Sequence, residues 1–234
     1  MIIILGLDYS CVVKFGCRNL MQACSGHTDL AEFSEMKTVV LWSSFLAEKN
    51  LEQEIKDKNV LWNFKLSVER TIFARFRNWR TLDVPGFSYD DAMHQQEREK
   101  LKDFFNKKGS IEEYDQAVFS NHQKSKEKFL QMLEEDYDIQ MGYFALADAI
   151  GHLSFGVTSK MRIAYQELDE LAGLAVKRSS SGLLILSDHG MEAVGRFGDH
   201  SRQGFWSSSL SIAENNLKLT HLFNIFMNSL ISYW

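Results

Sequence analysis

Three short apolar runs divide the chain, and each is followed by an acidic residue. They span residues 2–7, 139–146 and 182–186, and the acidic residues that follow are Asp8, Asp148 and Asp188. Unbroken apolar runs of this length are typical of strands that are buried on both faces of a parallel sheet. Between the second and third runs, residues 158–177 repeat apolar positions at helical spacing, which predicts a crossover helix. The pattern therefore predicts an α/β fold with a mostly parallel central sheet flanked by helices.

Other segments follow the helical period or carry turn signals. We expect helices over 67–79 and 217–234, short helical turns within 19–35, and a helix that begins near Thr38. Residues 81–89 predict a short strand that leads into a Pro-Gly turn at Pro85.

The segment 90–137 is the most polar part of the chain. Its apolar residues recur at helical intervals, and Ser110 with Glu113 fits a capping box at a helix start. We interpret the segment as a helical cap or lid inserted into one domain that spans residues 1–234. Two histidines within it, His94 and His122, have no neighbour at ligand spacing, so we expect both at the surface.

Composition narrows the classes of protein. Of 234 residues, 45% are hydrophobic and 24% charged, which is ordinary for a globular domain. The formal charge of −5 argues against bulk nucleic-acid binding. Three cysteines without metal-ligand spacing, and no membrane span or targeting segment, predict a cytoplasmic protein with reduced thiols and no membrane partner. The sequence does not indicate an oligomeric state.

Metal-ligand residue types gather after the apolar runs. His152 follows Asp148 by four residues, His189 adjoins Asp188, and His200 lies eleven positions further on, so that a short loop could return it to the same place. The carboxyl ends of parallel strands meet at one edge of a sheet. Three carboxylates and three imidazoles at that edge suit two divalent cations, and mixed nitrogen and oxygen ligands favour Zn²⁺ or Mn²⁺ over Ca²⁺ or Mg²⁺.

Two residues allow two local interpretations. Asp8 could face the site as a ligand or could cap the turn that follows it. Thr38 could cap its helix or act as a nucleophile at the positive end of the helix dipole. The residues alone do not decide between the alternatives for Asp8, whereas for Thr38 the local pattern favours the cap.

Taken in order, these elements resemble the alkaline phosphatase superfamily, and most closely its nucleotide pyrophosphatase/phosphodiesterase branch. The resemblance rests on the pattern Gly6-Leu7-Asp8, Thr38, Asp148 with Gly151-His152, Asp188-His189-Gly190 and His200. Trp42, four residues after Thr38, also matches the family, whereas Val40 stands where the family has proline.

The resemblance implies an alkaline phosphatase-like three-layer α/β/α fold and two divalent metal ions. One ion would be held by Asp8, Thr38, Asp188 and His189, and the other by Asp148, His152 and His200. The resemblance further implies that Thr38 attacks phosphorus and forms a phospho-threonine intermediate, and that Asn59 helps to hold the phosphoryl oxygens. The substrate would be a small phosphate ester or a nucleotide.

Alternative functions remain open at this point. A phosphomonoesterase or phosphomutase of the same superfamily would use the same metal ligands, although serine is its usual nucleophile. A catalytically weak metal-binding relative would keep the ligands without the chemistry. Phe87, Tyr89, Phe205 and Trp206 could stack on a nucleobase, but aromatic residues more often belong to the core or the rim of a site.

Overall fold

The computed structural model describes residues 1–55, 61, 63–178, 182–214 and 216–231. Its main sheet has seven strands in the order β3-β4-β1-β5-β8-β2-β9, and a two-stranded hairpin stands apart from it. The strands are β1 (Ile2–Leu5), β2 (Cys24–Asp29), β3 (Trp79–Leu82), β4 (Ile139–Phe144), β5 (Leu184–Ser187), β8 (Gly204–Ser208) and β9 (Asn216–Lys218). The hairpin consists of β6 (Gly190–Val194) and β7 (Phe197–Ser201).

The strands that precede the predicted ligands are parallel neighbours in the sheet. β1 lies between β4 and β5 and pairs in parallel with both, so that Ile2 is opposite Met141 on one side and Leu184 on the other. Strand β8 is antiparallel to β5 and to β2. The predicted mostly parallel α/β architecture is therefore confirmed.

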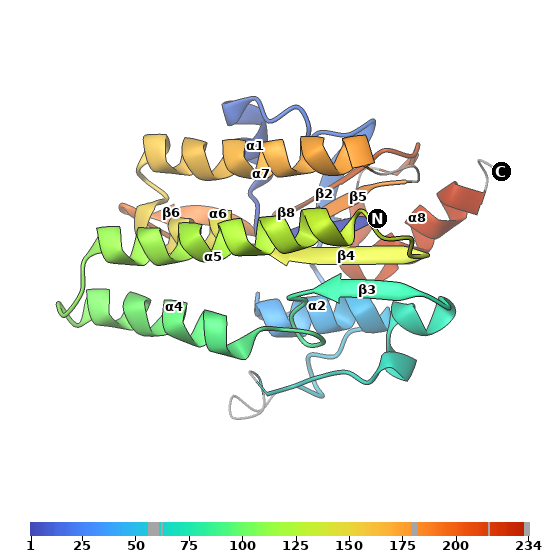
Figure 1. Ribbon diagram of the computed structural model, residues 1–234, viewed down its shortest axis with the longest axis horizontal. Helices are drawn as coiled ribbons and strands as arrows, with labels where there is room; N and C mark the ends of the chain where they lie inside the picture. Colours follow the sequence, from blue (N-terminus) through green and yellow to red (C-terminus); the bar gives the residue numbers. More distant parts are fainter. Residues whose placement is uncertain (56–60, 62, 179–181, 215, 232–234) are drawn as a thin grey trace.

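Helices cover both faces of the sheet (Figure 1). Their bounds are α1 (Tyr9–Phe15), α2 (Thr38–Ala47), α4 (Asp91–Phe105), α5 (Ile111–Met132), α6 (Leu146–Ser154), α7 (Thr158–Arg178) and α8 (Leu222–Ile231). One core cluster joins α1, α5, α6 and α7 to one face, and a second joins α2 and α8 to the other. Ile3 belongs to the first cluster and Ile2 to the second, because neighbouring side chains of a strand point to opposite faces.

Helix α5 approaches the sheet very closely at Gly142. A Cβ atom at this position of β4 would lie 2.6 Å from a ring carbon of Phe129, which is fully buried.

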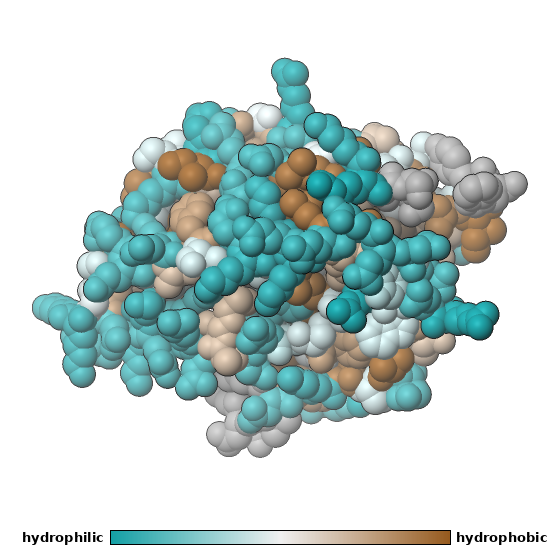
Figure 2. Space-filling view, viewed as in Figure 1, coloured by the Kyte–Doolittle hydropathy of each residue, from teal (hydrophilic) through white to brown (hydrophobic). Residues whose placement is uncertain are grey.

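Ser110 and Glu113 form the predicted capping box at the start of α5. On the face shown in Figure 2, hydrophilic side chains cover most of the surface. The interpretation of residues 90–137 as a lid stays a prediction.

Two secondary-structure predictions are wrong. The segment 67–79 forms two short 3₁₀ turns, Val68–Arg70 and Ile72–Arg75, because Thr71 between them is extended and its hydroxyl caps the second turn. The segment 19–35 contains β2, whose partners β8 and β9 lie far away in the sequence. The sequence of β2, CSGHTD, shows neither a helical period nor an alternation of apolar and polar residues. Within the described residues, no helix is both long enough and apolar enough to cross a membrane.

Candidate active site

Asp148 and His152 come from the first turns of α6, which begins directly after β4. The strand ends at Phe144, so Asp148 lies in the first turn of the helix and not at the strand end itself. One turn later His152 follows on the same face, with 3.7 Å between its Nε2 and Oδ1 of Asp148. The side chain of Asp148 is 13% exposed and that of His152 is 30% exposed.

Asp188 and His189 follow β5 and are almost completely buried. The Ser187 hydroxyl fixes this strand end, because it accepts a hydrogen bond from the Leu7 amide at 2.8 Å and donates one to the His189 carbonyl at 2.5 Å. The residue after His189 is Gly190, and only glycine fits there, because a Cβ atom would lie 2.4 Å from the Gln203 carbonyl oxygen. The sheet edge therefore holds both ligand candidates in one fixed position.

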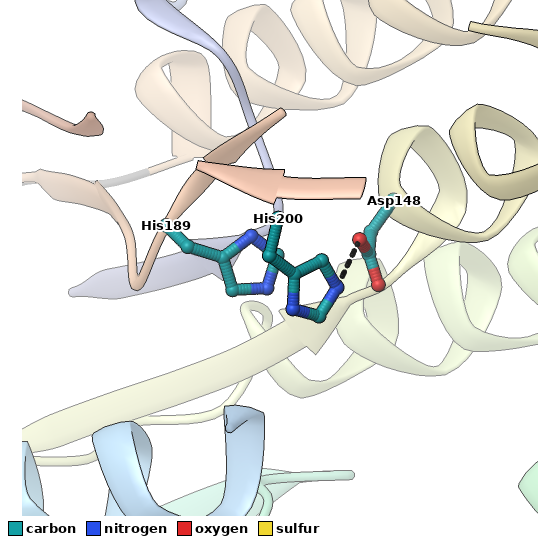
Figure 3. Close-up of side chains that lie close together, drawn as sticks. All are labelled: Asp148, His189 and His200. Carbon is teal, nitrogen blue, oxygen red and sulfur yellow. Dashed lines mark ion pairs between the residues drawn. The ribbon is translucent and has the colours of Figure 1, made fainter. Parts of the chain in front are cut away.

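His200 reaches the site on the β6–β7 hairpin. It pairs with Met191 across the hairpin, and its ring stacks on that of His189 with the ring centroids 3.7 Å apart. Its Nε2 lies 3.3 Å from Oδ1 of Asp148 (Figure 3). The predicted return of His200 to the site is thus confirmed, and a hairpin supplies it.

Asp148, His189 and His200 form a group that could hold a metal ion. One potential ligand atom from each lies within 4.8 Å of the other two (Figure 3). In both histidines Nδ1 donates to a backbone carbonyl, that of Gly190 at 3.0 Å for His189 and that of Met36 at 2.9 Å for His200. This leaves the Nε2 lone pair of each ring for a ligand, which is how metal-binding histidines are usually oriented.

Several buried atoms at this site have no hydrogen-bond partner among the described residues. They are Oδ1 of Asp148, both carboxylate oxygens of Asp188, and Nε2 of His200. The approach of His200 to Asp148 has the distance of an ion pair but forms no hydrogen bond. Each unsatisfied buried polar group costs about 1–3 kcal/mol, and buried charges are normally paired or bound to metal. The nitrogen and oxygen donors present therefore fit a divalent cation.

The pKa values of the two carboxyl groups at this site, Asp188 and Asp148, are shifted in opposite directions. Burial raises the pKa of Asp188 well above its usual value, and the charge of Asp148 adds to the effect. Burial also raises the pKa of Asp148, but the neighbouring His152, His200 and His189 outweigh burial and hold this pKa well below its usual range. Burial, together with the neighbouring His200, lowers the pKa of His189 to about 4, so that this ring is neutral at pH 7, as a metal ligand must be.

His200 behaves in the opposite way because it faces Asp148. Burial lowers its pKa, but the close approach and negative charge of Asp148 outweigh burial and raise the pKa to about 9. Without a metal ion, a protonated His200 would face Asp148 at 3.3 Å. A cation would take the place of that proton.

Thr38 is the first residue of α2, and the residue in the N-cap position is Lys37. The helix start is as predicted, but the hydroxyl of Thr38 does not occupy the cap position. Thr38 lines a cavity of about 160 Å³ together with Asp148, His152 and His200. The structure therefore brings the predicted nucleophile to the same cavity as three of the predicted ligands.

The two remaining predicted site residues are Asp8 and Asn59. Asp8 caps α1, where its Oδ1 accepts from the Cys11 amide at 3.2 Å and from the Ser10 hydroxyl. It lies outside the group formed by Asp148, His189 and His200, although a Cβ atom on Gly190 would be 3.0 Å from its Oδ2. The capping interpretation is therefore observed, and the ligand role stays a prediction. Asn59 lies outside the described residues.

Sequence reasoning missed a second polar group beside the cavity. His94 and His122 are each 6% exposed, so the prediction that they lie at the surface is wrong. His94 contacts Asp83 and Glu97, and His122 faces Glu167. The contact between His94 and Glu97 could have been predicted from their spacing, because residues three apart on a helix are neighbours.

Of the four aromatic candidates, Tyr89 lines the cavity, whereas Phe205 and Trp206 are fully buried in the core.

Comparison with known proteins gives a family. The model of the type I phosphodiesterase/nucleotide pyrophosphatase family matches residues 32–220, which is most of the chain. The chain belongs to this family. A comparison with curated proteins finds no match.

Solved structures give more distant similarities. Murine ectonucleotide pyrophosphatase/phosphodiesterase 5 is 14% identical, with a TM-score of 0.48 over 83% of this chain and 58% of that one. An inactive variant of the same murine protein in complex with AMP is 12% identical, with a TM-score of 0.47 and the same coverage. The PH0037 protein from Pyrococcus horikoshii is 15% identical, with a TM-score of 0.37 over 46% of this chain and 37% of that one. The chain thus spans less than two thirds of the length of each of these proteins.

Proposed function

We propose that this protein is a metal-dependent phosphoric ester hydrolase of the phosphodiesterase/nucleotide pyrophosphatase type. One observation carries the proposal: Thr38 lines the same cavity as Asp148, His152 and His200, next to buried ligand atoms that lack hydrogen bonds. The family match over residues 32–220 supports the same reaction class. The substrate would be a small phosphate ester or a nucleotide.

The ligand assignment is the one that the family resemblance implies. Asp148, His152 and His200 would hold one divalent cation, and Asp8, Thr38, Asp188 and His189 a second. The observed grouping of His189 with Asp148 and His200 means that the two sites adjoin. The donors suit Zn²⁺ or Mn²⁺.

The reaction would proceed through Thr38. Bound cations would supply Lewis-acid stabilisation of the reacting oxygens and lower the pKa of the threonine hydroxyl. The Oγ1 of Thr38 attacks phosphorus, a bond from this oxygen to phosphorus forms, and the bond to the leaving alcohol breaks as that alcohol regains a proton. Water then hydrolyses the phospho-threonine and restores the hydroxyl. The free amides at the start of α2 can donate to the non-bridging phosphoryl oxygens.

Substituting Thr38 tests the proposal. We expect Thr38→Ala to lower kcat for bis-p-nitrophenyl phosphate by about 10³-fold or more and Thr38→Ser to retain part of the activity, because only serine keeps a hydroxyl nucleophile. Thr158→Ala is the matched control, since Thr158 is also the first residue of a helix, α7, but lies outside the residues that line the cavity. Full diesterase activity in Thr38→Ala would exclude Thr38 as the nucleophile.

Two further measurements distinguish the alternatives. Comparison with p-nitrophenyl phosphate decides between a diesterase and a phosphomonoesterase or phosphomutase. Metal content by mass spectrometry, measured together with turnover, identifies a metal-binding relative without activity. Fewer than about one tightly bound transition metal per chain would contradict the enzyme assignment.

A further inference from the structure

The segment directly before Thr38 is held by side chains from two other parts of the chain. We call residues 33–37 the nucleophile loop. It lies outside the strands and helices of the fold, and α2 begins directly after it. The position of Thr38 relative to the metal ligands therefore depends on what holds this loop.

Glu52 holds the loop from the side of the turn that follows α2. Both of its carboxylate oxygens accept from the Ser34 amide at 3.0 Å, and Oε1 also accepts from the Ser34 hydroxyl at 2.7 Å and from the Glu35 amide at 3.0 Å. The Glu52 amide in turn donates to Oδ1 of Asn50 at 2.8 Å. Partial burial opposes the ionised form, but the hydrogen bonds from Ser34 and Glu35 outweigh it and lower the pKa of Glu52, so the carboxylate is ionised at pH 7.

Arg202 holds the same loop from the side of the hairpin. Its Nη1 donates to the Phe33 carbonyl at 2.7 Å and its Nη2 to the Ser34 carbonyl at 2.8 Å. Arg202 follows His200 by two residues, and His200 itself donates to the Met36 carbonyl. Strand β7 and the residue that follows it thus contact the nucleophile loop at three carbonyl groups, one through His200 and two through Arg202.

We propose that Arg202 and Glu52 are positioning residues that set the Thr38 hydroxyl against the metal ligands of the hairpin and the sheet edge. This inference rests on the proposed function, because it assigns a role to residues that support the same site. The position of the hydroxyl matters for the rate, since a reacting group displaced by about 1 Å can lose about 10²-fold in rate. The planar fork of arginine spans two neighbouring carbonyls, which a lysine ammonium cannot do with the same geometry.

Kinetics of Arg202 variants test the role. We expect Arg202→Ala to lower kcat about 10–100-fold, with KM changed by less than about threefold and bound metal unchanged, because outer contacts that orient a site typically have effects of this size. Arg202→Lys should recover little of the loss, and added guanidinium ion should restore part of it in Arg202→Ala. Arg178→Ala, at the exposed end of α7, is the matched control and should match wild type.

Hydrogen exchange tests the same role without using activity. In metal-free protein we expect Glu52→Ala to raise exchange at the Ser34 and Glu35 amides about tenfold or more, because both donate to this carboxylate. Glu54→Ala is the control, since Glu54 lies in the same turn but pairs with Arg70. Unchanged exchange in Glu52→Ala would overturn the role of that residue.

The outcomes separate this inference from the proposed function. If wild-type protein hydrolyses neither diester nor monoester, the proposed function fails, whereas the exchange result still reports on the loop. If wild type is active and Arg202→Ala keeps kcat within twofold, the positioning role of Arg202 is wrong. A loss of activity that follows a loss of bound metal would also overturn it.

Discussion

Two groups of histidine and carboxylate side chains lie beside the same cavity, and they differ in how their polar atoms are paired. In the first, Oδ1 of Asp148 and Nε2 of His200 form no hydrogen bond with any described residue, and neither does either carboxylate oxygen of Asp188. In the second, Nε2 of His94 lies 2.7 Å from Asp83 and its Nδ1 lies 3.3 Å from Glu97. Both groups are largely buried, so exposure to water does not explain the difference.

Neighbouring residues form further hydrogen bonds and a ring contact with the group around His94. The carboxylate of Asp83 also accepts from the Asp90 amide at 2.8 Å, and Glu97 accepts from Asn121 at 2.8 Å. Tyr89 stacks on the His94 ring, with the centroids 4.2 Å apart and the planes within 5°. A paired group of this kind stabilises a wall of the cavity, whereas unpaired ligand atoms leave room for a cation. Pairing thus separates His94 from Asp148, Asp188 and His200, whereas Nε2 of His122, which faces Glu167, also has no hydrogen bond with the described residues.

The largest effect should come from Asp188→Asn. In metal-free protein we expect the free energy of unfolding to stay the same or rise, because the change removes a buried carboxylate with no hydrogen bond. With Zn²⁺ the variant should lose most of the metal-induced stabilisation, about 2.7 kcal/mol at a hundredfold excess over Kd, and about 10³-fold in kcat. Urea unfolding with and without Zn²⁺ measures both effects. Full stabilisation of the variant by Zn²⁺ would count against Asp188 as a ligand.

An effect on stability that does not depend on metal should come from His94→Ala. We expect a loss of about 3–5 kcal/mol in the free energy of unfolding, because Asp83 and Glu97 would be left buried without their cationic partner. The loss should be the same with and without Zn²⁺, so the stabilisation by metal should persist. Urea unfolding provides the comparison, and His221→Ala, at an exposed histidine, is the control. A variant that also failed to bind metal would show that the two groups are coupled.

The smallest effect is a dependence on pH. Burial lowers the pKa of His94, but Asp83 and Glu97 outweigh burial and raise it to about 9 from an unfolded value near 6.5. A raised pKa contributes stability that is complete below about pH 6.5 and is lost as the pH rises through 9. The stability difference between wild type and His94→Ala should therefore shrink, by an amount on the order of 2 kcal/mol, between pH 6.5 and 9. A constant difference across this range would exclude the charged state of His94.

Local patterns predicted the central parallel strands and the acidic residues that follow them. The apolar runs before Asp8, Asp148 and Asp188 identified β1, β4 and β5, whereas the hairpin that carries His200 was expected only as a short loop. These features are set within a few residues of each ligand, so a single sequence can display them.

Features that depend on distant partners were not predictable in this way. The burial of His94 requires the packing of α4 against α5, and β2 is a strand because β8 and β9 flank it. The nucleophile loop is held through its backbone carbonyls, whose contact with Arg202 has no signature in residue type. The capping role of Asp8 could be foreseen only as one of two alternatives.

The central position of β1 has a consequence for the order in which the protein folds. Its parallel partners begin at Ile139 and Leu184, so both of its edges remain open until most of the chain is available. Contacts over such sequence distances slow folding, and an open strand edge can pair with another chain. Fragments that end before Leu184 should therefore aggregate, and cold or dilute refolding should favour the intact protein.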